Sequence, residues 1–283
     1  MKYKALILSA VLMLSMIGAA GCGDNGKKTE TASSQVSEQS KTEVSDQTSE
    51  ESKTASEGSE EKSEEPSEQS EAQGTPVLAS WFDDAVFIGD SVTLKLSYYA
   101  ENGDLGEANF LCEGSLGYHN CLDDIDKEGN VHPTYMGEKC TIFDGVSLIK
   151  PKKVFVMLGM NDIGLYGVDD TITVMQEVME KLKESCPDAV YYVQPVTPMI
   201  AGYSLGDLNN VNIRDFDEKL KAVCDEKGYN FIDVYSAVSD ENGDLPLEYC
   251  GDIPSDDNPN GMGLHFTAEG CKVWADYLKS HVS

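Results

Sequence analysis

Positive charge is scarce in this 283-residue chain. Lysine and arginine together number 21 against 50 aspartates and glutamates, so the formal net charge at neutral pH is −29. Residues 23–75 carry −9 of this and two N-terminal lysines contribute +2, which leaves −22 on residues 76–283. A domain of that charge repels polyanions. We therefore expect no nucleic-acid partner and no attraction to anionic lipid headgroups.

Metal-binding patterns are also missing from the sequence. No cysteine pair has the C-x-x-C spacing of a zinc site, and no cluster combines cysteine with histidine. We predict no metal and no cofactor. Cys186 and Cys271 fall on the apolar faces of expected helices, which predicts buried free thiols. The sequence leaves undecided whether two of Cys112, Cys121 and Cys140 form a disulfide, because an exported protein is able to form one but does not require it.

The first residues have the composition of an export signal. Lys2 and Lys4 precede an apolar run over residues 5–20, which is short for a membrane span of about 20 residues. Small residues before Cys22 resemble a bacterial lipobox, in which Cys22 is lipidated. We expect residues 1–22 to be a lipoprotein signal peptide, although Ala19 replaces the usual Leu and a plain signal peptide stays open. The protein is then extracytoplasmic and anchored to the cell membrane through that lipid only.

Aromatic side chains are absent from residues 23–76, where Ser, Glu, Gln, Thr and Lys predominate. Such a tract cannot bury enough apolar surface to offset the entropy lost on ordering. We predict that residues 23–76 form a disordered tether. Residues 77–283 then form one domain, which we expect to be a monomer.

Apolar runs and amphipathic stretches alternate along this domain. The expected strands are Val86–Ile88, Phe110–Cys112, Val154–Leu158, Val190–Gln194 and Phe231–Val234. Helical spacing of apolar residues follows in 172–186, 213–223 and 271–278. Residues 120–144 are polar and irregular, with a turn signal at Gly129-Asn130, and suggest a hairpin or excursion. Alternating strands and helices predict an α/β fold with a parallel sheet covered on both faces.

Ser91 stands at the junction between the first strand and the helix that follows it. Gly89 permits a turn there, and ligands bind beside such junctions in open α/β sheets. Ser91 is therefore a candidate nucleophile, although a helix-capping serine would look the same. Gly114-Ser115-Leu116-Gly117, Gly159-Met160-Asn161-Asp162 and His265 also follow strands or precede a helix.

The order Ser, Gly, Asn and His resembles the SGNH hydrolases, the GDSL-type esterase and lipase superfamily, over about residues 86–278. This resemblance implies a flavodoxin-like three-layer α/β/α sandwich with about five parallel strands. It also implies an oxyanion hole formed by the backbone N–H groups of Ser91 and Gly117 and the amide of Asn161. Gly114 is the fallback if the loop is shifted.

His265 is the expected base, because the other three histidines lie in or near the excursion or at the C-terminus. The family usually places an aspartate three residues before this histidine, and here that position is Met262. Asp252, Asp256 or Asp257 could orient the ring instead, with Asp257 preferred for its closeness in sequence. A Ser–His dyad, or a catalytically weak protein, also stays open.

These residues together predict a serine ester hydrolase of the acetylesterase type. An exported, tethered enzyme faces glycans, so we expect O-acetyl esters of carbohydrates as substrates. Lysophospholipids or other short acyl esters come second. An alternative from a different class is an inactive SGNH scaffold that serves as a surface glycan-binding lipoprotein.

Overall fold

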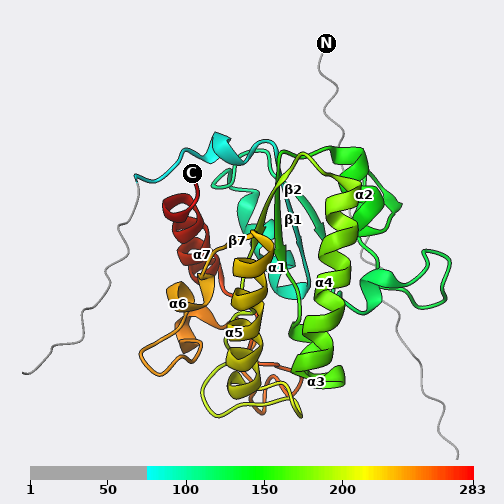
Figure 1. The fold of residues 1–283 in the computed structure, drawn as a ribbon. Helices are drawn as coiled ribbons and strands as arrows, with labels where there is room; N and C mark the ends of the chain where they lie inside the picture. The colour runs from blue at the N-terminus through cyan, green and yellow to red at the C-terminus, as the bar shows by residue number, and fades with distance from the viewer. Residues whose placement is uncertain (1–74) are drawn as a thin grey trace, which may run out of the picture. The chain divides into compact units, whose positions relative to one another are not determined.

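The computed structural model describes residues 75–283, and these are built around one parallel sheet (Figure 1). The predicted signal peptide and the predicted tether up to residue 74 lie outside the described residues. The sheet has the strand order β2-β1-β5-β6-β7. Its strands are β1 (Ala85–Gly89), β2 (Asn109–Cys112), β5 (Lys153–Met157), β6 (Val190–Val193) and β7 (Asn230–Phe231). The predicted flavodoxin-like α/β fold with five parallel strands is confirmed.

A row of aromatic rings crosses the middle of this sheet. Phe87 on β1 stacks on Phe110 and on Phe155, with ring centroids 5.1 and 4.5 Å apart. Phe155 stacks in turn on Tyr192 of β6 at 4.7 Å. All five residues of β1 are buried, as expected for a strand covered on both faces. The two central strands therefore form a rigid support for the loops at their carboxyl ends.

Helices cover both faces of the sheet. On one face α1 (Ser91–Ala100) packs against α7 (Ala268–His281). On the other face α4 (Val168–Ser185) lies between α2 (Ile142–Ile149) and α5 (Asn210–Lys227), and α4 and α5 stand in front of the sheet in Figure 1. Apolar residues of each amphipathic helix face the strands, which gives three layers around a continuous core.

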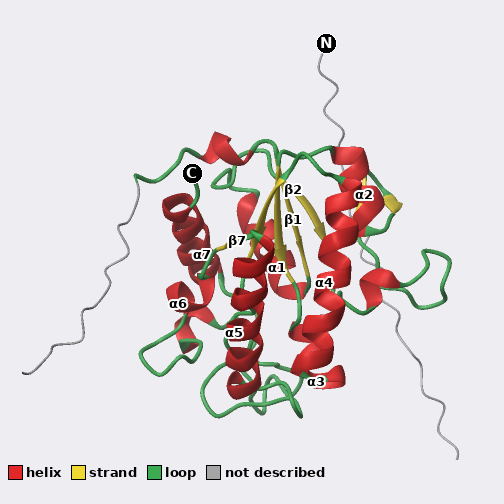
Figure 2. Cartoon of the chain, viewed as in Figure 1, coloured by secondary structure: helices red, strands yellow, loops and turns green. Residues whose placement is uncertain are grey.

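The remaining elements are short (Figure 2). They are the helices α3 (Met160–Tyr166) and α6 (Val234–Val238), the strands β3 (Thr134–Tyr135) and β4 (Glu138–Lys139), and the 3₁₀ turns η1 (Ala79–Phe82), η2 (Asn120–Leu122) and η3 (Leu247–Tyr249). The hairpin expected within residues 120–144 is the pair β3–β4. The strand expected over Phe231–Val234 is too long, because the Asp233 side chain accepts from the Ser236 N–H and starts α6.

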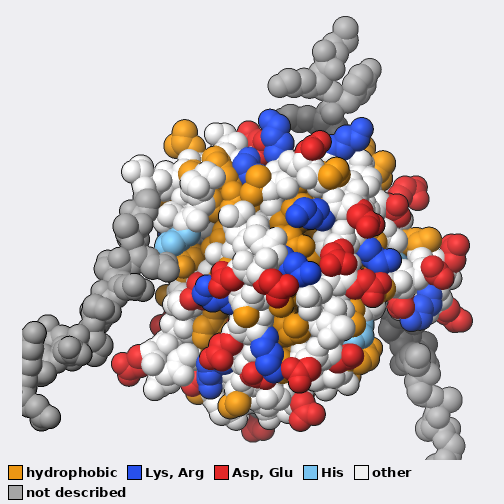
Figure 3. Space-filling model, in the orientation of Figure 1, with side chains coloured by type: hydrophobic (Ala, Val, Ile, Leu, Met, Phe, Trp, Pro, Cys, Tyr) orange, Lys and Arg blue, Asp and Glu red, His pale blue; other side chains and the backbone are white. Residues whose placement is uncertain are grey.

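The seven described cysteines are free thiols, so no disulfide joins them within residues 75–283. Cys186 and Cys271 are buried, as the apolar helix faces predicted. Acidic and basic side chains are spread over the face seen in Figure 3. Among residues 75–283, no helix is long and apolar enough to cross a membrane.

Candidate active site

Ser91 is the first residue of α1, and Asp90 alone separates it from the end of β1. The side chain of Asp90 caps this helix by accepting from the Val92 N–H at 2.9 Å. A Cβ on Gly89 would lie 1.9 Å from the Thr93 hydroxyl, so only glycine leaves room for α1 to pack this close to the end of β1. Within the described residues no side chain or carbonyl accepts from the Ser91 N–H. The turn thus presents a hydroxyl and an available donor at the same residue.

His265 lies against Ser91 although the two are 174 residues apart in sequence. Its Nε2 is 2.8 Å from the Ser91 Oγ, and its Nδ1 is 2.6 Å from Oδ2 of Asp252. Because an ionised carboxylate can only accept, Nδ1 carries a proton and donates to Asp252. Nε2 is then free to accept from the serine hydroxyl. Such a chain can withdraw the hydroxyl proton while the oxygen attacks.

Asp252 is held by several donors from the loop that folds around it. Beside the ring, the backbone N–H groups of Met262, Leu264 and His265 donate to its two oxygens at 3.0 to 3.1 Å. Partial burial tends to raise the pKa of Asp252, but the hydrogen bonds from the His265 ring, the His265 N–H and the Met262 N–H outweigh burial and lower that pKa. The carboxylate is therefore ionised at neutral pH and fixed in position.

The choice of Asp257 as the orienting acid is wrong, because the carboxylate at the ring is Asp252. An antiparallel bridge between Cys250 and Phe266 brings the two ends of this loop together, and the Gly251 N–H donates to the His265 carbonyl at 2.7 Å. Asp257 lies at the exposed turn between them. Met262 contributes its backbone N–H and not its side chain, so a residue that lacks a carboxyl is tolerated at this position.

The glycine-rich loop after β2 lies close to Asn161, the second residue of α3. The Asn161 amide donates to the Leu116 carbonyl at 3.0 Å and has a longer contact of 3.4 Å with Asp90. The Gly117 N–H donates to the side chain of Asn120 at 2.8 Å. This backbone donor is therefore already paired inside its own loop, and the oxyanion role predicted for it requires that Asn120 release it.

Asp162 holds this loop in place, a role that the sequence interpretation missed. Its buried carboxylate accepts from the N–H groups of Tyr118 and His119 at 2.9 and 3.0 Å. A Cβ on Gly117 would lie 2.5 Å from the same carboxylate. The His119 ring bridges Asp162 and Asp170 at 2.8 and 2.9 Å. In the sequence, the only indication of this role was that an aspartate directly follows Asn161.

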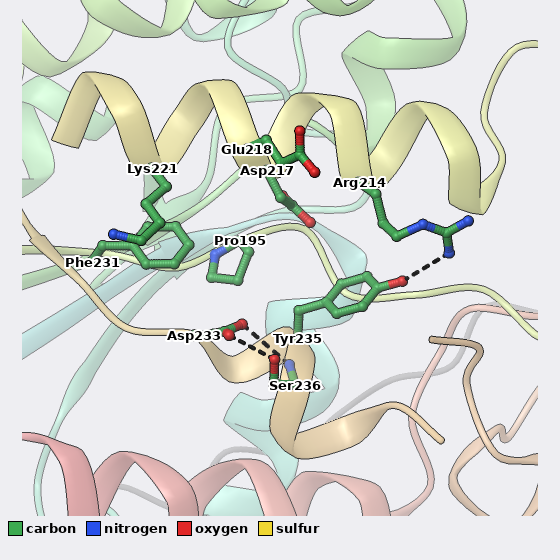
Figure 4. Close-up of a pocket in the computed structure, with 9 residues that line it drawn as sticks. All are labelled: Pro195, Arg214, Asp217, Glu218, Lys221, Phe231, Asp233, Tyr235 and Ser236. Carbon is green, nitrogen blue, oxygen red and sulfur yellow. Dashed lines mark hydrogen bonds between the residues drawn. The ribbon is translucent and has the colours of Figure 1, made fainter. Parts of the chain in front are cut away.

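Two described cavities differ in what lines them. One of about 340 Å³ opens beside Ser91 and His265. A second, of about 230 Å³, lies between α5 and α6 and contains none of the predicted site residues. Figure 4 shows Asp217 directing a carboxyl oxygen into this second cavity. Its other oxygen accepts from the Val196 N–H at 2.8 Å, and burial raises the pKa of Asp217 well above its ordinary value.

The fold and the hydrogen-bond chain define a class of protein: an α/β domain with a serine, a histidine and a carboxylate in series at the carboxyl edge of a parallel sheet. The chain belongs to the GDSL-like lipase/acylhydrolase family, whose model matches residues 87–273. This span includes Ser91, Asn161, Asp252 and His265.

Solved structures of low sequence identity share the fold. A GDSL-like lipase from Bacteroides thetaiotaomicron is 17% identical with a TM-score of 0.50, covering 69% of this chain and 85% of that one. A Bacteroides fragilis protein with a proposed acylhydrolase activity is 18% identical with a TM-score of 0.50, covering 69% and 84%. A protein from Streptococcus pneumonia, proposed to be a platelet activating factor, is 16% identical with a TM-score of 0.51, covering 75% and 85%. No curated protein matches the chain.

Proposed function

We propose that this protein is a serine esterase that hydrolyses small acyl esters. The observation that carries this proposal is the hydrogen-bond chain from Ser91 through His265 to Asp252, with contacts of 2.8 and 2.6 Å. A surface binding protein has no need of this geometry. The inactive alternative rested on Met262, and Asp252 supplies the carboxylate that Met262 lacks.

The reaction follows from the positions of the two proton-carrying groups. The Ser91 oxygen attacks the ester carbonyl carbon while Nε2 of His265 takes the hydroxyl proton. The resulting imidazolium is stabilised by the Asp252 carboxylate and then donates that proton to the departing alcohol oxygen. Water attacks the acyl-serine in the same way, with its proton passing through His265 to Ser91. The products are the free alcohol and the carboxylic acid.

The oxyanion of each tetrahedral intermediate needs donors that are already in place. We assign this role to the Ser91 N–H and to the Asn161 amide hydrogen that is not donated to Leu116 and has only the 3.4 Å contact with Asp90, with the Gly117 N–H joining them when Asn120 moves away from it. Loss of one such donor typically costs about 100- to 1000-fold in rate. Asp162 acts as a positioning residue, because it fixes the loop that carries Gly117.

For the substrate we propose O-acetyl esters of glycans, met outside the cytoplasm by a protein tethered through lipid on Cys22. The support is the composition of residues 1–76, which is typical of a lipoprotein signal followed by a tether. Fractionation tests the anchoring: the protein should enter the membrane fraction, and Cys22→Ala should release it. Retention of Cys22→Ala in the membrane would argue against a lipid at that residue.

Hydrolysis of 4-nitrophenyl acetate by the purified protein tests the esterase activity, with Ser91→Ala as the control. Acetate release from O-acetylated oligosaccharides, compared with fatty-acid release from lysophospholipid, tests the substrate class. We expect hydrolysis that depends on Ser91 and a preference for the acetylated glycan. Activity that survives in Ser91→Ala, or a wild-type protein that cleaves none of these esters, would contradict the proposal.

A further inference from the structure

The cavity beside Ser91 has one wall made by a single face of α1. Four of its lining residues occupy positions i, i+3, i+4 and i+7 of that helix, so their side chains lie on the same face. These four are Ser91, Leu94, Lys95 and Tyr98. His265 and Phe266 line the cavity from the opposite segment. With a volume of about 340 Å³, the space suits a group of about one ring.

The position of His265 decides which part of an ester enters this cavity. The general acid must lie within hydrogen-bond reach of the oxygen that leaves, so the alcohol departs on the side of the ring. His265 and Asp252 both line the cavity, whereas Asn161 and Gly117 do not. The acyl oxygen therefore points toward Asn161, and the alcohol portion occupies the space between His265 and α1.

Lys95 is the one cation among the residues that line this cavity. Its side chain is exposed, and within residues 75–283 no carboxylate forms an ion pair with it. By contrast, the carboxylate of Asp252 in the same cavity is paired with His265. The ammonium of Lys95 is therefore available to a ligand. Tyr98 stands one turn further along α1 and is 57% exposed, so its ring can also contact a ligand.

The rest of the domain is strongly acidic, so an unpaired cation in this cavity indicates which charge the cavity prefers in a ligand. Residues 76–283 carry a net charge of −22, but salt screens that field beyond about 8 to 10 Å. At contact distance the unpaired lysine determines the local preference. A neutral alcohol would gain nothing from Lys95, whereas an anionic one gains a direct ion pair.

We infer that the alcohol half of the substrate carries a negative charge, a carboxylate or a phosphate, which pairs with Lys95 while Tyr98 contacts its apolar face. On a glycan this describes an acidic sugar. The inference rests on the proposed esterase function and narrows its substrate. Lys95 is thus a specificity-determining residue of the site that contains Ser91.

Matched aryl esters test this inference. The anionic 4-acetoxybenzoate and the neutral 4-acetoxybenzamide have nearly the same shape. A third ester, 4-acetoxyphenyl phosphate, tests a phosphate in place of the carboxylate. We expect the ratio of kcat/KM for anionic to neutral ester to fall about 3- to 10-fold in Lys95→Gln and further in Lys95→Glu, mainly through KM. The control is Lys181→Gln on α4, which removes the same charge from an exposed pair with Glu177 and should keep the ratio.

An unchanged ratio in Lys95→Glu would overturn the inference, as would an equal change in Lys181→Gln. Binding of the product 4-hydroxybenzoate, followed by saturation-transfer NMR, gives a readout that needs no turnover. We expect Lys95→Glu to abolish binding that the wild-type protein shows; no binding to the wild type would also overturn the inference. If the wild type cleaves neither ester, the proposed function fails separately, and the binding result still decides the role of Lys95.

Discussion

The carboxylate of Asp252 lies 2.6 Å from the ring of His265, thirteen residues further along the chain. The contact replaces the aspartate that the family places three residues before the histidine, a position held here by Met262. The loop between the two residues folds back on itself and turns three of its backbone N–H groups toward the same carboxylate. Orientation of the imidazole therefore depends on the geometry of this loop.

Replacing Asp252 should strongly reduce activity. Asp252→Asn removes the charge that stabilises the imidazolium and that fixes the protonated nitrogen, which in serine hydrolases can cost about 10⁴-fold in kcat. Asp257→Asn is the matched control, because this residue lies at the exposed turn of the same loop. Steady-state hydrolysis of 4-nitrophenyl acetate measures both. A loss of only a few-fold in Asp252→Asn would mean that the site works without this acid, and equal large losses in the two variants would mean that the effect is not specific to Asp252.

Asn161→Ala should lower kcat by about 100-fold or more while KM changes little, as expected when a donor to the oxyanion is lost. The circular dichroism spectrum and the melting temperature should stay near those of the wild type. Full activity in Asn161→Ala would exclude the amide from the oxyanion hole. Unfolding would instead indicate that its bond to Leu116 is structural.

Gly117→Ala tests the packing of the loop that carries the third donor. The new methyl group would lie 2.5 Å from the Asp162 carboxylate, which is itself held by two backbone N–H groups. The loop must shift, and kcat should fall by about 100-fold or more. Gly114→Ala is the control, because a Cβ there meets no atom within 4 Å. Similar activities of the two variants would show that the position of Gly117 is unimportant.

The buried acid that caps α1 makes stability depend on pH. Burial, helped by the nearby charge of Asp162, raises the pKa of Asp90 from 3.8 to about 7. Between these values the unfolded chain loses the proton while the folded protein keeps it, so the contribution of Asp90 to stability falls as pH rises and stays low above about 7.

Asp90→Asn cannot ionise and still suits a helix cap. The melting temperature of Asp90→Asn minus that of the wild type should therefore be larger at pH 8 than at pH 4.5. Differential scanning calorimetry at the two values of pH measures this difference. The same difference at both values of pH would show that Asp90 does not titrate in this range.

Local sequence patterns were enough to predict the α/β fold and the positions of Ser91 and His265. Ser91 and His265 each lie beside a strand–helix or loop–helix junction, where a few neighbouring residues fix the direction of the chain. Asp252 could not be singled out, because its approach to His265 depends on the pairing of Cys250 with Phe266 at the two ends of a long loop. Three aspartates in that loop looked alike in sequence, and closeness in sequence favoured the wrong one.

The pairing of the Gly117 N–H with Asn120 was hidden for a similar reason. A side chain three residues ahead can turn back to a backbone donor only in a particular loop conformation, and composition does not specify that conformation. The short helix α3 was also missed. Its start at Gly159 has a φ of 123°, a conformation that favours glycine, and this lets the chain leave β5 and form a helix at once.

Covalent labelling of Ser91 tests the central claim most directly. A fluorophosphonate probe reacts with a serine that an adjacent base activates, and it needs no knowledge of the natural substrate. After incubation of the whole protein and digestion, mass spectrometry should find the adduct on Ser91, and Ser91→Ala should not be labelled. An adduct on another serine that persists in Ser91→Ala, or no labelling of the wild type, would contradict the account.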